Sequence, residues 1–193
     1  AMLWEQKLSV PPEEAAVPFV NPAKEVSDVA AALAGAGDIL AENISDTAAY
    51  RSFLRNAVRN CGSLVVSAAK GAPESSVYEM YYEFEESISK IVGHRILAIN
   101  RGEGEKILTV KIEAPVLNIT EYLEKQIIKN NNEITTPVLK AVIEDSYERL
   151  IAPSIERDIR SELTENAEDG AITVFGKNLK QLLMQQPIVG KTV

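Results

Sequence analysis

The fold is decided by one stretch, Gly93-His94-Arg95-Ile96-Leu97-Ala98-Ile99-Asn100-Arg101-Gly102-Glu103-Gly104-Glu105-Lys106-Ile107-Leu108-Thr109-Val110-Lys111-Ile112-Glu113. Its first apolar residues, at 96, 97 and 99, are spaced as on the buried side of a helix end. Its last apolar residues, at 108, 110 and 112, alternate with polar ones, as in a strand with one buried face. The stretch therefore predicts a helix that ends near Arg101 to Gly104 and a strand over 107–113.

A second apolar run, over 63–69, also has the composition of a strand. Because a lone strand leaves its backbone groups unpaired, we expect 63–69 to pair with 107–113. Residues 77–84 are aromatic and fit either an extended segment or a helix start, whereas 85–100 favour a helix that is interrupted near Gly93. The fold class is thus mainly α (α+β), a helical array with a small two-stranded antiparallel β element.

The remaining chain suggests three consecutive parts. Residues 1–23 form a proline-rich leader, in which we expect Trp4, Phe19 and Val20 to pack onto the body. Residues 24–114 form a compact helical unit that contains the β pair. Residues 115–193 form a helical arm, in which Pro153 breaks or kinks a helix and a last amphipathic helix ends before Pro187. Thr192 and Val193 resemble the beginning of a further strand.

Composition excludes several classes of protein. The chain has 193 residues, a formal net charge of −8, one cysteine (Cys61) and one histidine (His94). A single cysteine gives no disulfide framework and no zinc cluster, which favours a reducing, cytoplasmic location. No apolar run is long enough to span a membrane, so we expect no membrane partner. Ala1 before Met2 is interpreted as a remnant of cloning.

Enzymatic signals are weak, and we expect no catalysis, no cofactor and no metal. Gly102-Glu103-Gly104 does not continue as a GxGxxG motif. His94 could act as a general base, but no nucleophile motif accompanies it, and the favoured interpretation is a histidine at a helix end. The acidic residues Glu83, Glu85 and Glu86 are interpreted as a solvated face, because a metal site needs more oxygen ligands around a turn.

The 93–113 stretch is positively charged although the chain is acidic, and we interpret it as the least acidic part of the protein. Arg95, Arg101, Lys106 and Lys111 are candidate nucleic-acid-binding residues if they share one face, where they could contact phosphates without reading bases. The alternative for Arg101 is an interaction with the C-terminal end of a helix. A further set of aromatic residues could stack on bases, although such spacing is more often found in a core. This set is Tyr78, Tyr81, Tyr82 and Phe84.

Three motifs resemble the Tex family of bacterial transcription accessory proteins. His94 to Glu103 is similar to the HRxLAxxRGE element of that family, and Tyr147 to Glu156 is similar to its Y-x-R-L-[LI]-x-P-S-x-E element. Val174 to Leu183, followed by Pro187 and Gly190 to Val193, is similar to the helix that leads into the RNase-H-like (YqgF) domain of the family. The motifs occur in the family's order and the resemblance covers about residues 20–193.

The resemblance implies a truncated piece of a multi-domain cytoplasmic factor, which continues with an RNase-H-like domain, helix-hairpin-helix elements and an S1 domain that binds nucleic acid. The implied function is structural: helices position RNA- or DNA-binding domains of an elongation-type factor. The alternative is a protein-interaction module that docks RNA polymerase or another factor. We expect RNA or DNA to be bound through the full-length protein, and the fragment itself to be monomeric.

Overall fold

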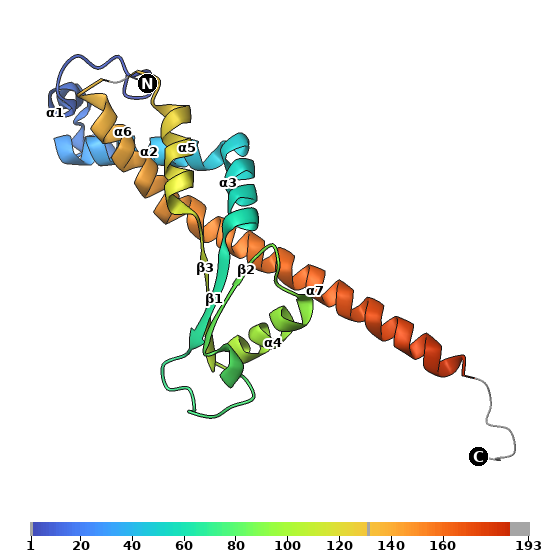
Figure 1. Cartoon of the computed structure of the whole chain (residues 1–193). Helices are drawn as coiled ribbons and strands as arrows, with labels where there is room; N and C mark the ends of the chain where they lie inside the picture. The colour runs from blue at the N-terminus through green and yellow to red at the C-terminus, as the bar shows by residue number, and fades with distance from the viewer. Residues whose placement is uncertain (1, 131, 186–193) are drawn as a thin grey trace, which may run out of the picture. The chain divides into compact units, whose positions relative to one another are not determined.

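The computed structural model describes residues 2–130 and 132–185 (Figure 1). The chain forms two compact units, each built from two separate segments. The first unit contains Ala1–Gly62 and Ala114–Arg157, and the second contains Ser63–Glu113 and Asp158–Val193. The consecutive division into 1–23, 24–114 and 115–193 stays a prediction. The expected strand at Thr192 and Val193, with Pro187 and Gly190 to Val193 of the third motif, lies outside the described residues.

The first unit is helical. Its elements are α1 (Pro12–Ala16), the 3₁₀ turns η1 (Val17–Phe19) and η2 (Pro22–Lys24), α2 (Val29–Asp46), α3 (Ala48–Cys61), α5 (Val116–Ile127), α6 (Thr135–Asp145) and the π-helical turn η4 (Ser146–Ile151). Asp28 caps α2 by accepting the Ala31 N–H at 2.7 Å. α2 packs against α6 and η4, and the buried hydroxyl of Ser146 donates to the Ala41 carbonyl at 2.7 Å.

Pro153 does not end a helix. The chain stays helical from Thr135 through η4 into α7 (Ala152–Leu183). A proline inside an α-helix removes one hydrogen bond and crowds the carbonyl four residues earlier. The π turn directly before Pro153 has wider hydrogen bonding, with the Ala152 N–H donating to the Tyr147 carbonyl. This widening accommodates the proline, so the helix continues and the predicted break is wrong, whereas the alternative of a kink stays a prediction.

The leader packs through residues other than those expected. Phe19 is 68% exposed, so its expected packing onto the body is wrong. Gln6 and Leu8 are buried instead. The Gln6 side chain donates to the Ile127 carbonyl and accepts the Asn130 N–H, each at 2.6 Å. Because a buried amide needs these partners, the contact fixes the leader against the end of α5.

A three-stranded antiparallel sheet forms the second unit together with α4 (Gly93–Gly104) and α7. The strands are β1 (Ser63–Ala68), β2 (Glu83–Ser87) and β3 (Leu108–Glu113), in the order β2-β1-β3. The predicted pairing is confirmed, with Leu64 opposite Ile112 and Val66 opposite Val110. The third strand, β2, was not predicted. A helix was expected from residue 85, but residues 85–87 belong to β2 and α4 begins only at Gly93.

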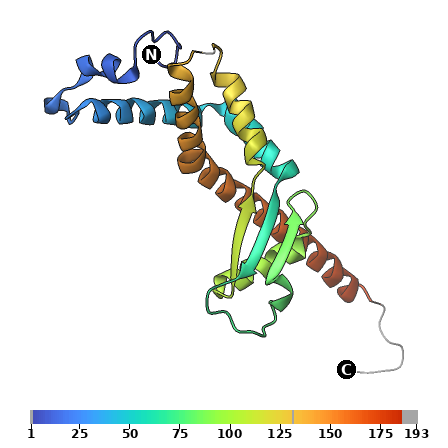
Figure 2. The ribbon, with the colours of Figure 1, turned by 60° about the vertical axis from the view of Figure 1, so that its left-hand side comes forward.

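One core holds the sheet to the two helices, and Figure 2 shows α4 behind the three strands. It contains buried residues of β1, β3, α4, α7 and the loop before β2, and Phe84 of β2 packs against it. The buried residues are Leu64, Val66, Tyr78, Tyr81, Ile96, Ile99, Leu108, Val110 and Ala167. Tyr78 and Tyr81 are therefore core residues, which confirms that interpretation over base stacking. Burial raises the pKa of the Tyr78 hydroxyl, and its hydrogen bond to Glu105 raises that pKa further.

Polar contacts fasten α7 to α4 within this unit. Arg160 donates to the Glu103 carboxylate and to the Asn100 side chain, and Asn100 donates to Thr164 Oγ1 at 2.8 Å. At the other end of α4, Gly93 lies so close to α7 that an added Cβ would be 3.1 Å from Ala167 Cα. The beginning of α4 therefore needs a residue without a side chain.

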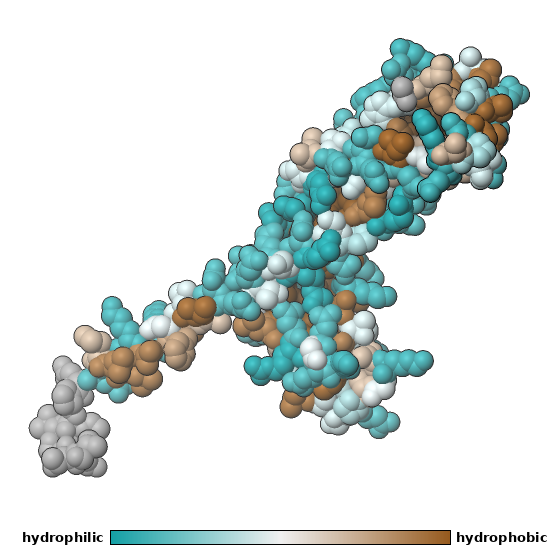
Figure 3. All heavy atoms as spheres, turned by 180° about the vertical axis from the view of Figure 1, so that it is seen from behind, coloured by the Kyte–Doolittle hydropathy of each residue, from teal (hydrophilic) through white to brown (hydrophobic). Residues whose placement is uncertain are grey.

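The last part of α7 exposes many apolar side chains, and Figure 3 shows them as a brown surface. They include Ile172 (68% exposed), Phe175 (67%) and Leu183 (75%). Among the described residues, no helix is both long and apolar enough to cross a membrane.

We predict that Gly102→Ala destabilises the chain by about 1–3 kcal/mol, because an added methyl group overpacks the core. A Cβ at Gly102 would lie 2.6 Å from Leu108 Cδ1, and Leu108 is itself buried. Urea denaturation measures the change in the free energy of unfolding. Gly104→Ala is the matched control, because no atom lies within 4 Å of its added Cβ. Equal stability of the two variants would contradict the packing described here.

Candidate nucleic-acid interface

Arg95 is engaged within the fold. It lies on α4, and its guanidinium donates to Glu86 Oε2 of β2 at 2.7 Å. The same group lies 5.8 Å from the centre of the Phe84 ring, which is a cation–π distance. Arg95 therefore fastens α4 to the edge strand β2.

Arg101 and Lys106 lie close together along the chain at the C-terminal end of α4, and both are exposed. Lys106 has a positive φ of 61°, and its N–H donates to the Glu103 carbonyl at 2.9 Å. This hydrogen bond caps the end of α4. The two cations are interspersed with Glu103 and Glu105, so the local positive charge is partly cancelled.

Lys111 faces the other side of the sheet. Burial alternates along β3, with Leu108 and Val110 in the core shared with α4, and Thr109 and Lys111 exposed. Since successive side chains of a strand point to opposite faces, Lys111 points away from α4. The four predicted residues therefore do not share one face. No observation tests their role in binding, which stays a prediction.

His94 is exposed on the first turn of α4. Within residues 2–130 and 132–185, no three His, Cys, Asp or Glu side chains gather as a metal site would require. Glu83 and Glu85 are exposed, in agreement with a solvated face, whereas Glu86 is half-buried and accepts a hydrogen bond from Arg95.

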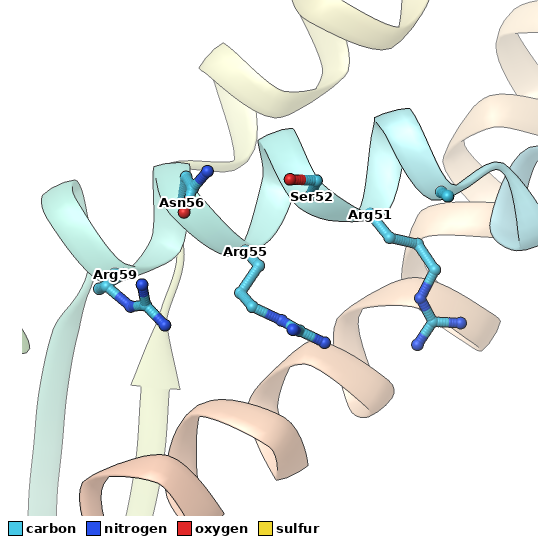
Figure 4. A pocket seen from close by; sticks show the side chains of 6 residues that line it. Arg51, Ser52, Arg55, Asn56 and Arg59 are labelled. Carbon is cyan, nitrogen blue, oxygen red and sulfur yellow. The ribbon is translucent and has the colours of Figure 1, made fainter. Parts of the chain in front are cut away.

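The densest positive charge is on α3, where Arg51, Arg55 and Arg59 follow one another at intervals of four residues. Figure 4 shows their side chains leaving the same side of the helix. Together with Ala48, Ser52 and Asn56, they line a shallow hollow of about 360 Å³. Arg51 donates to Ser154 Oγ at 2.5 Å. All three arginines are half-buried, and a guanidinium is the donor group that matches phosphate geometry best.

The sequence contains a signal for this arginine face. Ala48–Cys61 holds three arginines and no acidic residue, so α3 is less acidic than the 93–113 stretch. The interpretation of 93–113 as the least acidic part is therefore wrong. A count of charge over each expected helix would have identified α3, because residues four apart lie on one helical face.

The helical array and the small antiparallel sheet define a mainly α-helical α+β region with basic residues on α3 and near the end of α4. The profile of the family described as Tex central region-like matches residues 7–175. The chain therefore belongs to the Tex family.

Several relatives are similar in sequence to nearly the whole of this chain. YdcI of Bacillus subtilis (strain 168), an uncharacterised protein, is 50% identical over 177 residues, which cover 91% of this chain and 25% of YdcI. S1 RNA-binding domain-containing protein 1 of Homo sapiens is 32% identical, covering 96% of this chain and 20% of that protein. Transcriptional accessory protein Tex of Neisseria gonorrhoeae is 29% identical, covering 96% of this chain and 25% of that protein. This chain thus spans a quarter or less of these relatives.

We predict that α3 contributes more to RNA affinity than the end of α4 does. The observable is the slope of log affinity against log salt, which becomes shallower by ~0.7 for each single-strand phosphate that the protein no longer neutralises. Arg51→Gln with Arg55→Gln should reduce that slope more than Arg101→Gln with Lys106→Gln, because acidic neighbours offset the second pair. Fluorescence anisotropy with labelled single-stranded RNA measures the affinity.

Lys125→Ala on α5 is a control for the removal of surface charge, because its side chain is 76% exposed. Thermal melting checks that each variant is folded. Equal slopes for the α3 and α4 variants would show that the arginine face makes no special contribution.

Proposed function

We propose that this chain is a structural helical region of a nucleic-acid-associated transcription accessory protein, in which it positions RNA- or DNA-binding domains. The observation that supports this role is the uninterrupted helical path from Thr135 to Leu183. α7 alone has 32 residues, which corresponds to about 48 Å at 1.5 Å per residue. Since a helix fixes both the rise and the rotation of each residue, it can hold attached domains at a set separation.

The exposed apolar end of α7 supports the same role. Large apolar surfaces on a helix are usually covered in the complete protein. We propose that the RNase-H-like domain, which the Tex resemblance places after this helix, covers Ile172, Phe175 and Leu179. The human relative is named for an S1 RNA-binding domain. This name supports RNA as a ligand of the parent protein.

We propose no catalytic role and no cofactor, and a cytoplasmic location stays a prediction. His94 is exposed on α4, and the hollow beside α3 is lined by arginines and small polar residues that suit anion binding. Such a set binds phosphate through charge and hydrogen bonds and supplies no nucleophile with its general base.

A second candidate function is a protein-interaction module that docks RNA polymerase or another factor. It is favoured by the exposure of Val77 (85%) and Met80 (75%) on one short loop of the second unit. Exposed apolar residues that lie close together are typical of protein contacts.

The positioning role predicts that function depends on the helical phase of α7. Two alanines inserted after Gly170 in the full-length parent rotate the following segment by about 200°, whereas seven alanines rotate it by nearly two full turns. We expect the two-residue insertion to weaken RNA affinity at least tenfold or so, because separate binding regions no longer engage one strand together.

The seven-residue insertion is the matched control and should retain more of the affinity, although it is longer. RNA titration of both full-length variants measures the difference. If both insertions bind RNA as tightly as the unmodified parent, α7 does not position the binding domains.

A further inference from the structure

The connection between β1 and β2 is residues 69–82, and residues 69–81 of it form a closed surface loop, drawn in dark green in Figure 1. The Ala68 N–H donates to the Tyr82 carbonyl at 3.2 Å, so the two ends of the loop are adjacent. The Ala69 N–H donates to the Ile107 carbonyl at 2.8 Å, which ties the loop to the segment before β3. Compact loops with neighbouring ends are frequently functional.

Hydrogen bonds within the loop fix its path. The Tyr82 hydroxyl donates to the Pro73 carbonyl at 2.6 Å and lies 2.9 Å from Ser76 Oγ. Ser76 Oγ also accepts the Tyr78 N–H at 3.0 Å. A tight turn precedes these contacts, where Gly71 has a φ of 90° that other residues rarely adopt. The loop is therefore held in one conformation by its own polar groups.

Two buried tyrosines anchor the loop from below. Tyr78 and Tyr81 are only 5% and 7% exposed, and the Tyr78 hydroxyl donates to Glu105 Oε1 at 2.9 Å. Gly102 leaves the space that the Tyr78 ring occupies, since an added Cβ would lie 3.1 Å from Tyr78 Cδ1. The loop thus rests on the core of the second unit.

Between these anchors the loop presents Val77 and Met80 to solvent, 85% and 75% exposed. Both belong to the short segment around the 3₁₀ turn η3 (Glu79–Tyr81). A loop that is already ordered loses little conformational entropy when it binds. Its two apolar side chains are therefore suited to insert into a pocket of another molecule.

The charge around the loop favours a protein partner over a nucleic acid. Residues 69–86 contain five glutamates and one basic residue, Lys70, and of the five only Glu86 is paired with Arg95 in the ion pair described above. Glu74 and Glu79 are exposed and flank Val77 and Met80 in the sequence. Such a segment repels phosphates and attracts basic side chains.

We infer that the 69–81 loop is a docking element that places Val77 and Met80 in an apolar pocket, rimmed by lysine or arginine, on a partner protein. This inference rests on the second candidate function and is independent of the positioning role.

The test begins with photo-crosslinking in cells that express the full-length parent. A benzoylphenylalanine replaces Met80 in one variant and Leu117 in the control, because Leu117 of α5 is similarly exposed at 79%. A protein crosslinked from position 80 and not from position 117 is identified by mass spectrometry and purified. Its affinity for the parent is then measured by biolayer interferometry, with labelled single-stranded RNA as a separate probe.

We expect Val77→Asp with Met80→Asp to weaken binding of that protein at least tenfold or so, as loss of central apolar anchors does. Glu74→Lys with Glu79→Lys should also weaken binding of that protein, whereas Leu117→Asp should leave it unchanged. The affinity for RNA should not fall in any of these variants. The inference is overturned if position 80 yields no specific crosslink or if the loop variants bind the partner normally. If the loop variants bind the partner normally, the second candidate function is retained, but the partner binds another surface of the protein. A loss of RNA affinity in the Asp variant would instead assign the loop to nucleic acid.

Discussion

The structure of the second unit depends on the central position of β1, whose backbone is paired on both sides. β3 supplies one partner strand and β2 the other, with Val66 opposite both Val110 and Phe84. Unpaired strand groups are costly when buried, so the segments at 83–87 and 108–113 are both needed to satisfy β1. The same pairing brings the two ends of the 69–81 loop together and places the α4 end, with Gly102, beneath Tyr78.

The sequence predicts those elements whose apolar period is unambiguous. The alternation at 108, 110 and 112 identified β3, and the apolar spacing at 96, 97 and 99 identified α4, which ends at Gly104. β2 was missed because Glu83, Phe84, Glu85 and Glu86 offer one apolar side chain among acids, and pairing with β1 decides its conformation. The π turn before Pro153 was missed because it depends on helical packing around Ser146 and Tyr147, which no local pattern encodes.

The candidate site was predicted less well than the fold, for a physical reason. Basic residues near one another in the sequence were expected to converge, but the pleat of β3 turns Lys111 away from α4 and the Glu86 carboxylate engages Arg95. On α3 the helical repeat gathers Arg51, Arg55 and Arg59 on one side. The first unit thus contains an arginine-rich helix, and the second contains an acidic loop with exposed apolar side chains.

Residue-resolved amide hydrogen exchange under native conditions tests the central pairing most directly. In the antiparallel register the Lys111 N–H faces β1 and the Val66 N–H faces β2. If β1 is held by both neighbours, the amides of Val66 and Lys111 should be among the slowest to exchange in the second unit and should share one opening free energy, as members of one cooperative unit do. Rapid exchange at Lys111 while Val66 stays protected would show that β3 is not an integral partner, and it would contradict the account.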